Sequence, residues 1–281
     1  MRVHHLGCGT MCPRGGGWLD GRSGGLLSPA ELVCHVLLVE TDRHGLVLVD
    51  TGFGLDDCAA PRDRLGGVFP GLAAPVLDAA ETARRQIEAL GLDPADVRHV
   101  VLTHMDLDHA GGLSDFPDAS VHLYVEEHRA ATDPPTRAER QRYRACQWAH
   151  GARFETYEAT GEPWMGFACA RDLRGLPPEI LLVPLTGHSR GHSAVAVDTG
   201  ATGAGRWLLH CGDAYFHEDE LNVERPSCPG GLRFFQKLVA FDKADMLQNQ
   251  ARLRALMRAH GDEVRAFSAH DAAELARMQA R

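Results

Sequence analysis

The sequence predicts an α/β fold, because short apolar runs typical of strands alternate with longer segments that have helical spacing. Two runs, Val33 to Glu40 and Leu46 to Val49, flank a polar turn and predict a hairpin that ends in Asp50-Thr51-Gly52. A third run, Val100 to Leu102, leads directly into the segment Thr103 to Gly112, which places two histidines and two aspartates within six positions. Ligand sites of α/β proteins gather at such strand ends, so the fold class also predicts where the site lies.

Composition restricts the class of protein. The chain has 281 residues, 44% of them hydrophobic and 24% charged, which is ordinary for a folded domain and excludes disordered, coiled-coil and collagen-like proteins. We expect one domain over residues 1–281. The formal net charge of -9 disfavours nucleic acid and anionic membranes as partners, and no apolar run approaches the roughly 20 residues of a membrane span. The expected partner is a small molecule, and the oligomeric state stays open.

The beginning of the chain and its cysteines predict a cytoplasmic location. Residues Met1 to Cys8 contain no apolar core of the kind that signal peptides have. The eight cysteines are therefore expected to be reduced thiols rather than a disulfide framework. Cys8 and Cys12 form one close pair, which without a second pair is weak evidence for a metal site.

Further elements of the first half are predicted from spacing and from turn residues. The segment Phe53 to Pro75 is rich in Gly and Pro, has little periodicity, and is expected to be a lid or binding loop. Asp78 to Leu90 has helical spacing and is followed by Gly91, a favourable helix stop. The strand His99 to Thr103 follows.

The middle of the chain is less regular. A strand is predicted at Val121 to Val125 and a basic amphipathic helix at Arg137 to His150. Within the mixed interval Gly151 to Pro178, the apolar group Trp164 to Phe167 fits either core packing or the wall of a substrate pocket.

The second half returns to strands and ends with one long helix and a last strand. The expected strands are Ile180 to Leu185, Ala194 to Asp198, Trp207 to His210 and Val264 to Ser268, and the expected helix is Lys237 to His260.

Residues that bind metals follow four of these strands. Burying two histidines and two aspartates without partners would cost several kcal/mol, whereas a divalent cation neutralises the carboxylates and accepts the imidazole nitrogens as ligands. A helix cap at Asp106 or Asp108 explains one of these side chains but leaves the others unexplained. The candidate ligands at the strand ends are His104, Asp106, Asp108 and His109, then His192, Asp213 and His270.

Taken together, these motifs resemble those of metallo-β-lactamase superfamily hydrolases. The matching features, in chain order, are Asp50-Thr51-Gly52, Thr103-His104-x-x-x-Asp108-His109-x-Gly111-Gly112, Gly187-His188-x-x-Gly191-His192-Ser193, Gly212-Asp213 and Ser268-Ala269-His270-Asp271. The resemblance covers most of the chain. It implies a four-layered αββα sandwich with the metal ions between two sheets at one edge.

The resemblance also implies roles for individual residues. It assigns His104, Asp106 and His192 to a first ion, and Asp108, His109 and His270 to a second ion, with Asp213 between the two. His188 is the alternative to His192. Asp50 resembles a buried aspartate that orients the ligand loop. Two divalent ions, Zn²⁺ first, would deprotonate a water near neutral pH for attack on the substrate.

One position departs from the family pattern, because Asp106 stands where a second histidine is usual. Two divalent ions with three carboxylates leave a formal charge of +1, whereas the usual two carboxylates leave +2. We therefore expect a less acidic water and better acceptance of Mn²⁺ or Fe²⁺ beside Zn²⁺. A site with a single ion is the alternative, if Asp106 points away.

Among the hydrolases of this superfamily, the chain looks most like N-acyl-homoserine lactonases, which implies hydrolysis of a small lactone or carboxylic ester. In that comparison Tyr215 corresponds to a tyrosine that holds the lactone carbonyl, and Asp108 is a catalytic residue as well as a ligand. Alternatives are hydrolysis of a thioester, β-lactam or phosphoester, a mononuclear iron enzyme of the persulfide dioxygenase kind, and a binding protein that keeps the fold and one metal.

Overall fold

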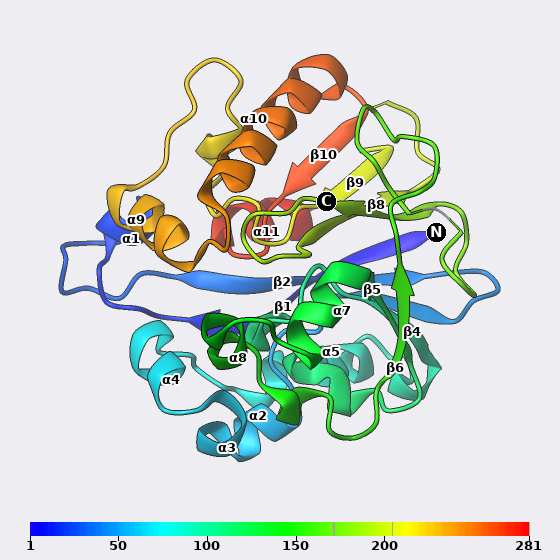
Figure 1. Cartoon of the computed structure of the whole chain (residues 1–281), viewed down its shortest axis with the longest axis horizontal. Coiled ribbons are helices and arrows are strands. Elements are labelled where there is room, and N and C mark those ends of the chain that lie inside the picture. The colour runs from blue at the N-terminus through cyan, green and yellow to red at the C-terminus, as the bar shows by residue number, and fades with distance from the viewer. Residues whose placement is uncertain (171, 204, 281) are drawn as a thin grey trace.

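A computed structural model describes residues 1–170, 172–203 and 205–280 and contains two β-sheets packed face to face between helices (Figure 1). The first sheet has the order β1-β2-β3-β4-β5-β6, antiparallel from β1 to β3 and parallel from β3 to β6. The second has the order β10-β9-β8-β7, in which only β10 and β9 are parallel. The strands are β1 (Arg2–Met11), β2 (Leu32–Glu40), β3 (Leu46–Val49), β4 (Val97–Val101), β5 (Ser120–Tyr124), β6 (Arg153–Tyr157), β7 (Ile180–Pro184), β8 (Ser193–Asp198), β9 (Trp207–His210) and β10 (Val264–Phe267).

Alternating side chains divide the interior into three apolar layers. In β2, Val36 and Leu38 face the helices, whereas Leu37 and Val39 face the second sheet. Successive side chains of a strand point to opposite faces, so a strand buried on both faces is a continuous apolar run. This explains why β2 contains hardly any polar residue.

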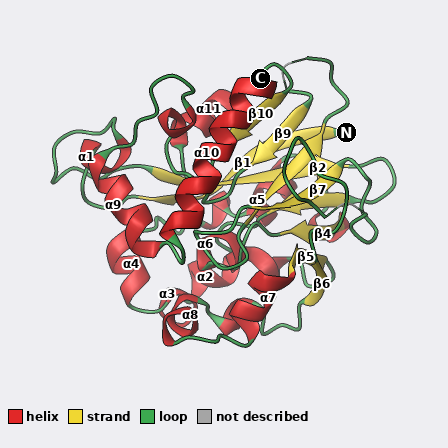
Figure 2. Cartoon of the chain, turned by 45° about the horizontal axis from the view of Figure 1, so that its top comes forward, coloured by secondary structure: helices red, strands yellow, loops and turns green. Residues whose placement is uncertain are grey.

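Helices cover the outer face of each sheet, which completes the αββα order expected from the resemblance (Figure 2). Helices α5 and α7 contribute to the core outside the first sheet, and α10 packs on the second sheet through Leu253 and Leu256. The α-helices are α1 (Gly17–Asp20), α2 (Leu55–Ala59), α3 (Pro61–Leu65), α4 (Val68–Ala73), α5 (Ala83–Ala89), α6 (Leu107–Ala110), α7 (Val125–Thr132), α8 (Arg137–Arg142), α9 (Gly230–Val239), α10 (Lys243–His260) and α11 (Ala272–Gln279). The short 3-10 helices are η1 (Ala79–Glu81), η2 (Pro94–Asp96), η3 (Gly111–Asp115), η4 (Ala145–Gln147) and η5 (Glu218–Leu221).

The segment 53–75 is helical rather than an irregular loop. It forms α2, α3 and α4, which are too short to show a helical period in the sequence. The buried Arg64 anchors them, because its guanidinium donates to Asp57 Oδ1 at 2.9 Å and to the carbonyl of Gly111 at 3.0 Å. Gly111 lies just beyond His109, so this lobe is attached directly to the turn that carries the candidate ligands.

All three predicted helices have different bounds in the structure. The expected helix from Asp78 to Leu90 is η1 followed by α5, because the extended Thr82 ends the first and caps the second. The expected helix from Lys237 to His260 is two helices, because the backbone N–H groups of Phe241 and Asp242 donate to the carbonyls of His188 and Gly187 instead of continuing α9. Asp242 then caps α10. The expected helix from Arg137 to His150 ends at Arg142, and η4 follows after a short extended break. Strand β1 and helix α11 were not predicted from the sequence.

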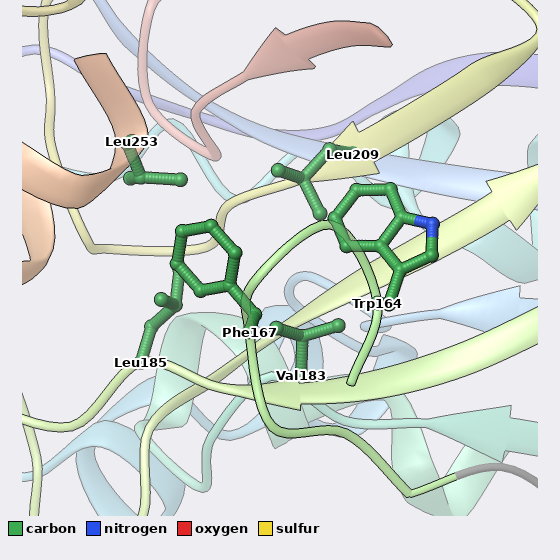
Figure 3. Close-up of a pocket in the computed structure, with 6 residues that line it drawn as sticks. All are labelled: Trp164, Phe167, Val183, Leu185, Leu209 and Leu253. Atoms are coloured by element: carbon green, nitrogen blue, oxygen red, sulfur yellow. The ribbon is translucent and has the colours of Figure 1, made fainter. Parts of the chain in front are cut away.

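The apolar group around Trp164 is part of the core. Figure 3 shows Trp164 and Phe167 beside Val183, Leu185, Leu209 and Leu253, which come from the second sheet, the segment after β7 and α10. Trp164 is 3% exposed and Phe167 is 4% exposed. Core packing is therefore the correct one of the two interpretations, and the group is not the wall of a substrate pocket.

Two further observations concern the whole chain. All eight cysteines have free thiols, so none forms a disulfide. Within the described parts of the chain, no helix combines the length and the apolar character needed to cross a bilayer.

Candidate metal centre

The candidate ligands meet at one edge of the two packed sheets. Strands β4, β7, β9 and β10 all end there, because β7, β9 and β10 run in the same direction and the parallel β3 and β4 lie opposite. The segment after β4 carries His104 to His109, the turn after β7 carries His188 and His192, and Asp213 and His270 follow β9 and β10. Four segments distant in the sequence thus supply one cluster.

One set of donor atoms surrounds His188 Nε2. This nitrogen lies 3.2 Å from Asp106 Oδ2 and 3.2 Å from Asp213 Oδ2. His104 Nε2 is 3.3 Å from the same Asp106 oxygen and 3.9 Å from Asp213 Oδ2. His104, Asp106 and His188 form one of the groups with donor atoms close enough to share an ion.

A second set surrounds the other oxygen of Asp213. Oδ1 lies 3.2 Å from His109 Nε2 and 3.0 Å from His270 Nε2. Asp108 completes the set, with Oδ1 at 4.0 Å from His109 Nε2 and Oδ2 at 3.7 Å from His270 Nε2. The thiol of Cys34 also lies within 4.8 Å of the donor atoms of Asp108 and His270.

These separations fit two metal ions. Ligand atoms about 2.0–2.1 Å from a tetrahedral Zn²⁺ lie about 3.3 Å from one another, close to most of the separations above. His104 Nε2, His109 Nε2 and Asp213 Oδ1 are buried and have no hydrogen-bond partner among the described residues. Buried polar atoms without a partner are rare, and here all three converge on the centre. Because Asp213 points one oxygen into each set, it has the geometry of a bridging ligand.

Hydrogen bonds at Nδ1 orient three of the imidazoles. His109 Nδ1 lies 2.8 Å from Asp50 Oδ2, and His270 Nδ1 lies 2.7 Å from the carbonyl of Val33. His104 Nδ1 is 3.0 Å from the Thr103 hydroxyl. Each ring therefore turns Nε2 towards the centre, which is the usual arrangement of histidines that bind metals. Asp50 has the position expected from the sequence for an orienting aspartate.

The structure favours His188 over His192, contrary to the preference drawn from the sequence. His192 Nδ1 lies 2.9 Å from the carbonyl of Leu185, and Nε2 accepts the backbone N–H of Asp213 at 2.9 Å. Both ring nitrogens of His192 are therefore engaged with the backbone, away from the carboxylates. His188 Nε2 lies beside Asp106 and Asp213, with Arg142 Nη2 at 2.6 Å. His192 instead fixes the backbone of Asp213.

We expect substitution of the two histidines to have different effects. His188→Ala should remove one equivalent of metal, because it deletes a donor of the first set. His192→Ala should lower the free energy of unfolding of the chelator-treated protein by roughly 2–4 kcal/mol, because it leaves a cavity and a buried backbone donor without a partner. Elemental analysis and denaturant unfolding measure both quantities. Loss of an ion from His192→Ala with unchanged stability of the chelator-treated protein would reverse the assignment.

Tyr215 does not reach the centre. Its side chain is fully buried, and its hydroxyl donates to the Glu274 carboxylate at 3.0 Å in the core behind β9 and β10. The predicted role in holding a substrate carbonyl is therefore wrong. Its neighbour Phe216 faces the centre instead, with its ring stacked on His270 at 5.0 Å between centroids.

The potential around the second donor set is negative. Burial lowers the pKa of His109, but the charges of Asp213, Asp50 and Asp108 outweigh burial and raise the pKa well above its usual value. The pKa of His270 is also raised, because Asp213 and Asp108 outweigh burial there. A site that favours protonated imidazoles is one where a cation is stabilised.

Arg142 changes the charge balance expected from the sequence. Its guanidinium binds both oxygens of Asp106, with Nε to Oδ1 at 2.6 Å and the terminal nitrogen to Oδ2 at 2.6 Å. Burial tends to raise the pKa of Asp106, but the charge of Arg142 is the largest of the effects that hold it well below its usual range. With this cation, the formal charge of a loaded centre returns from +1 to +2.

Two residues that organise the centre, Arg142 and Glu127, were not predicted from the sequence. Glu127 is fully buried and accepts the backbone N–H of Met105 at 2.9 Å and of Gly191 at 3.0 Å. It also accepts the hydroxyls of Ser189 and Tyr143. Its carboxylate thus connects both ligand-bearing turns. Neither residue lies in a motif, and only the three-dimensional fold brings them to the site.

The fold and the paired donor sets define a class of metal-binding proteins, and comparison with known proteins identifies the family. Residues 29–256 match the metallo-beta-lactamase superfamily. The chain is 46% identical over 271 residues to the probable metallo-hydrolase Rv2300c of Mycobacterium tuberculosis, which covers 96% of this chain and 80% of the relative. The chain therefore belongs to the metallo-beta-lactamase superfamily.

Other relatives carry lactonase names. The chain is 37% identical over 94 residues to the N-acyl homoserine lactonase AttM of Agrobacterium fabrum, which covers 34% of this chain and 35% of the relative. It is 25% identical over 208 residues to the N-acyl homoserine lactonase AiiA of Bacillus thuringiensis subsp. kurstaki, covering 71% of this chain and 72% of the relative. A solved N-acyl homoserine lactone hydrolase with bound product has a TM-score of 0.69 at 21% identity, over 97% of this chain and 94% of that one. At this identity the structural likeness supports the fold.

Proposed function

We propose that this protein is a metal-dependent hydrolase that opens a small lactone or carboxylic ester at a centre of two divalent ions. The observation that carries the proposal is Asp213, which points one carboxylate oxygen into each of two adjacent donor sets. His104, Asp106 and His188 would hold one ion with Asp213, and Asp108, His109 and His270 would hold the other. The imidazole and carboxylate donors suit Zn²⁺, and the three carboxylates also accept Mn²⁺ or Fe²⁺.

The chemistry divides between the ions and the protein. Two ions held by these residues would supply a nucleophile from water near neutral pH and would polarise the carbonyl of the substrate. Asp213 would hold the two donor sets at a fixed distance from each other. Asp108, whose side chain is 12% exposed, accepts no hydrogen bond from the described residues. It would therefore take up the proton that the attacking water loses and pass it to the leaving oxygen.

Apolar side chains beside the second donor set favour a substrate with an apolar part. Leu107, between the two ligand aspartates, belongs to a cluster with Phe53, Cys34 and Leu65. Phe69 of α4 packs against this cluster, with its ring 6.0 Å from that of Phe53. The cluster itself is buried, so the partly buried Phe69 is the apolar wall that would desolvate the acyl part of an ester or lactone. A phosphoester with several negative charges would gain little from it.

The mononuclear alternative has less support. The second donor set contains His109, His270 and Asp108 with Asp213 between the two sets. An enzyme that needs one iron ion has no use for a complete second set.

A substrate panel tests the proposal. Purified protein, chelated and then reloaded with Zn²⁺ or Mn²⁺, is assayed with lactones, aryl esters, thioesters, a β-lactam and a phosphodiester, using a pH indicator. The proposal predicts the highest kcat/KM for lactones or carboxylic esters and loss of turnover on chelation. Turnover of the phosphodiester alone, or turnover that survives chelation, would contradict it.

Phe69→Ala tests the apolar wall. We expect kcat/KM for an ester with a long acyl chain to fall by about 3–10-fold, because roughly 1 kcal/mol of apolar contact is lost. Short-chain esters and the metal content should be unaffected. Leu90→Ala, which truncates an exposed side chain at the end of α5 outside this cluster, is the control. An equal loss for short and long chains would show that Phe69 does not contact the acyl group.

A further inference from the structure

We propose that Asp106 and Arg142 act as one functional unit that replaces the histidine usual at position 106, with Arg142 as the positioning residue that sets how Asp106 serves the first ion. The inference rests on the proposed function, because it concerns the first of the two ion sites. Such a unit would allow the centre to hold three carboxylates, where the family pattern implies two.

Arg142 binds Asp106 in a bidentate geometry. Two parallel hydrogen bonds of 2.6 Å join the guanidinium to the two carboxylate oxygens. Such pairs fix the plane of the carboxylate as well as its place. Oδ2 is thereby kept 3.3 Å from His104 Nε2 and 3.2 Å from His188 Nε2, where it completes the first donor set.

Arg142 also holds a second ligand of the same set. The terminal nitrogen that pairs with Asp106 Oδ2 also lies 2.6 Å from His188 Nε2. The other terminal nitrogen donates to the backbone carbonyls of His188 and Val239, each at 2.9 Å. The guanidinium is 18% exposed and lies between α8, the turn after β7 and the end of α9. It therefore connects three segments around the first donor set, and a lysine with one ammonium group could not make these contacts together.

Charge explains why the two residues belong together. A carboxylate with its guanidinium is formally neutral, as an imidazole is, so the pair restores the charge that the family pattern has at this position. A guanidinium is not deprotonated in proteins. Removing Asp106 alone would therefore leave a confined cation beside the first ion, and Arg142 would repel the ion it normally tolerates.

The experiment compares Asp106→His with Asp106→His/Arg142→Met. The single variant restores the usual histidine but leaves the guanidinium without its carboxylate partner. We therefore expect the protein to bind one equivalent of Zn²⁺ tightly and the second equivalent more weakly, on the order of 10-fold or more. The double variant should recover the second equivalent. Asp106→His/Arg140→Met is the control, because Arg140 is an exposed arginine of the same helix and its removal should not restore binding.

Elemental analysis after dialysis and isothermal titration of chelated protein with Zn²⁺ give the readout, which does not depend on activity. If the Met variant does not fold, Arg142→Gln, which keeps amide donors for the two carbonyls, takes its place in the Asp106→His background. Tight binding of two equivalents by Asp106→His alone, or failure of both double variants to recover the second equivalent, would overturn the proposal. A wild-type protein that binds no divalent ion would instead refute the proposed function.

Discussion

Asp213→Asn should abolish tight binding of both ions and lower kcat/KM by more than about 100-fold. Loss of a residue that merely supports a ligand costs roughly 10–100-fold, and Asp213 is a donor in both sets, with its oxygens 3.0 Å from His270 Nε2 and 3.2 Å from His188 Nε2. An amide offers one neutral oxygen and one N–H group, so it cannot place an anionic oxygen in each set. Elemental analysis and turnover of a lactone or ester measure the two effects.

Two other substitutions distinguish a bridging role of Asp213 from a role in one donor set alone. His188→Ala should remove the first ion and leave the second, whose donors are His109, His270 and Asp108. Asp219→Asn, at an exposed aspartate of η5, should change neither metal content nor rate. Two tightly bound ions in Asp213→Asn would show that this carboxylate is not the bridge.

Glu127→Gln should have the second large effect, because it should lower both the free energy of unfolding and the affinity for the first ion. The carboxylate accepts four donors, with Ser189 and Gly191 at Oε2 and Met105 and Tyr143 at Oε1. In glutamine one of these oxygens becomes an NH₂ group that faces two donors. We expect the free energy of unfolding to fall by about 2–4 kcal/mol, because buried donors without a partner each cost roughly 1–3 kcal/mol.

Binding of the first ion should weaken as well, since the two connected turns carry His104, Asp106 and His188. Denaturant unfolding and Zn²⁺ titration measure the two effects. Glu126→Gln is the matched control, because this neighbour on α7 is 39% exposed and pairs with Arg129 at the surface. Equal stabilities of the Glu126 and Glu127 variants would show that the buried carboxylate does not hold the turns.

Much of the fold was predictable because strands buried on both faces leave a plain pattern. The runs that form β2, β3 and β9 were predicted to within a residue, since apolar runs flanked by turn residues have few other interpretations. Helices α2 to α4 were not, because they depend on the buried Arg64, whose partners are remote in the sequence. The break between α9 and α10 likewise depends on contacts with the turn at His188.

The candidate site shows the same division. The motif residues His104, Asp108, His109, Asp213 and His270 meet as the spacing and the resemblance predicted. The choice between His188 and His192 was not decidable from the sequence, because it depends on which ring the backbone of Leu185 and Asp213 engages. Tyr215 was misplaced for a similar reason, since its hydroxyl has a partner in Glu274 that no local pattern reveals.

A metal titration of activity tests most directly whether a two-ion centre opens lactones or esters. Chelated protein is titrated with Zn²⁺, and in parallel with Mn²⁺, while lactone or ester hydrolysis is followed at each addition. We expect no turnover without metal and full activity at two equivalents per chain. Full activity at one equivalent, or turnover of the chelated protein, would contradict it.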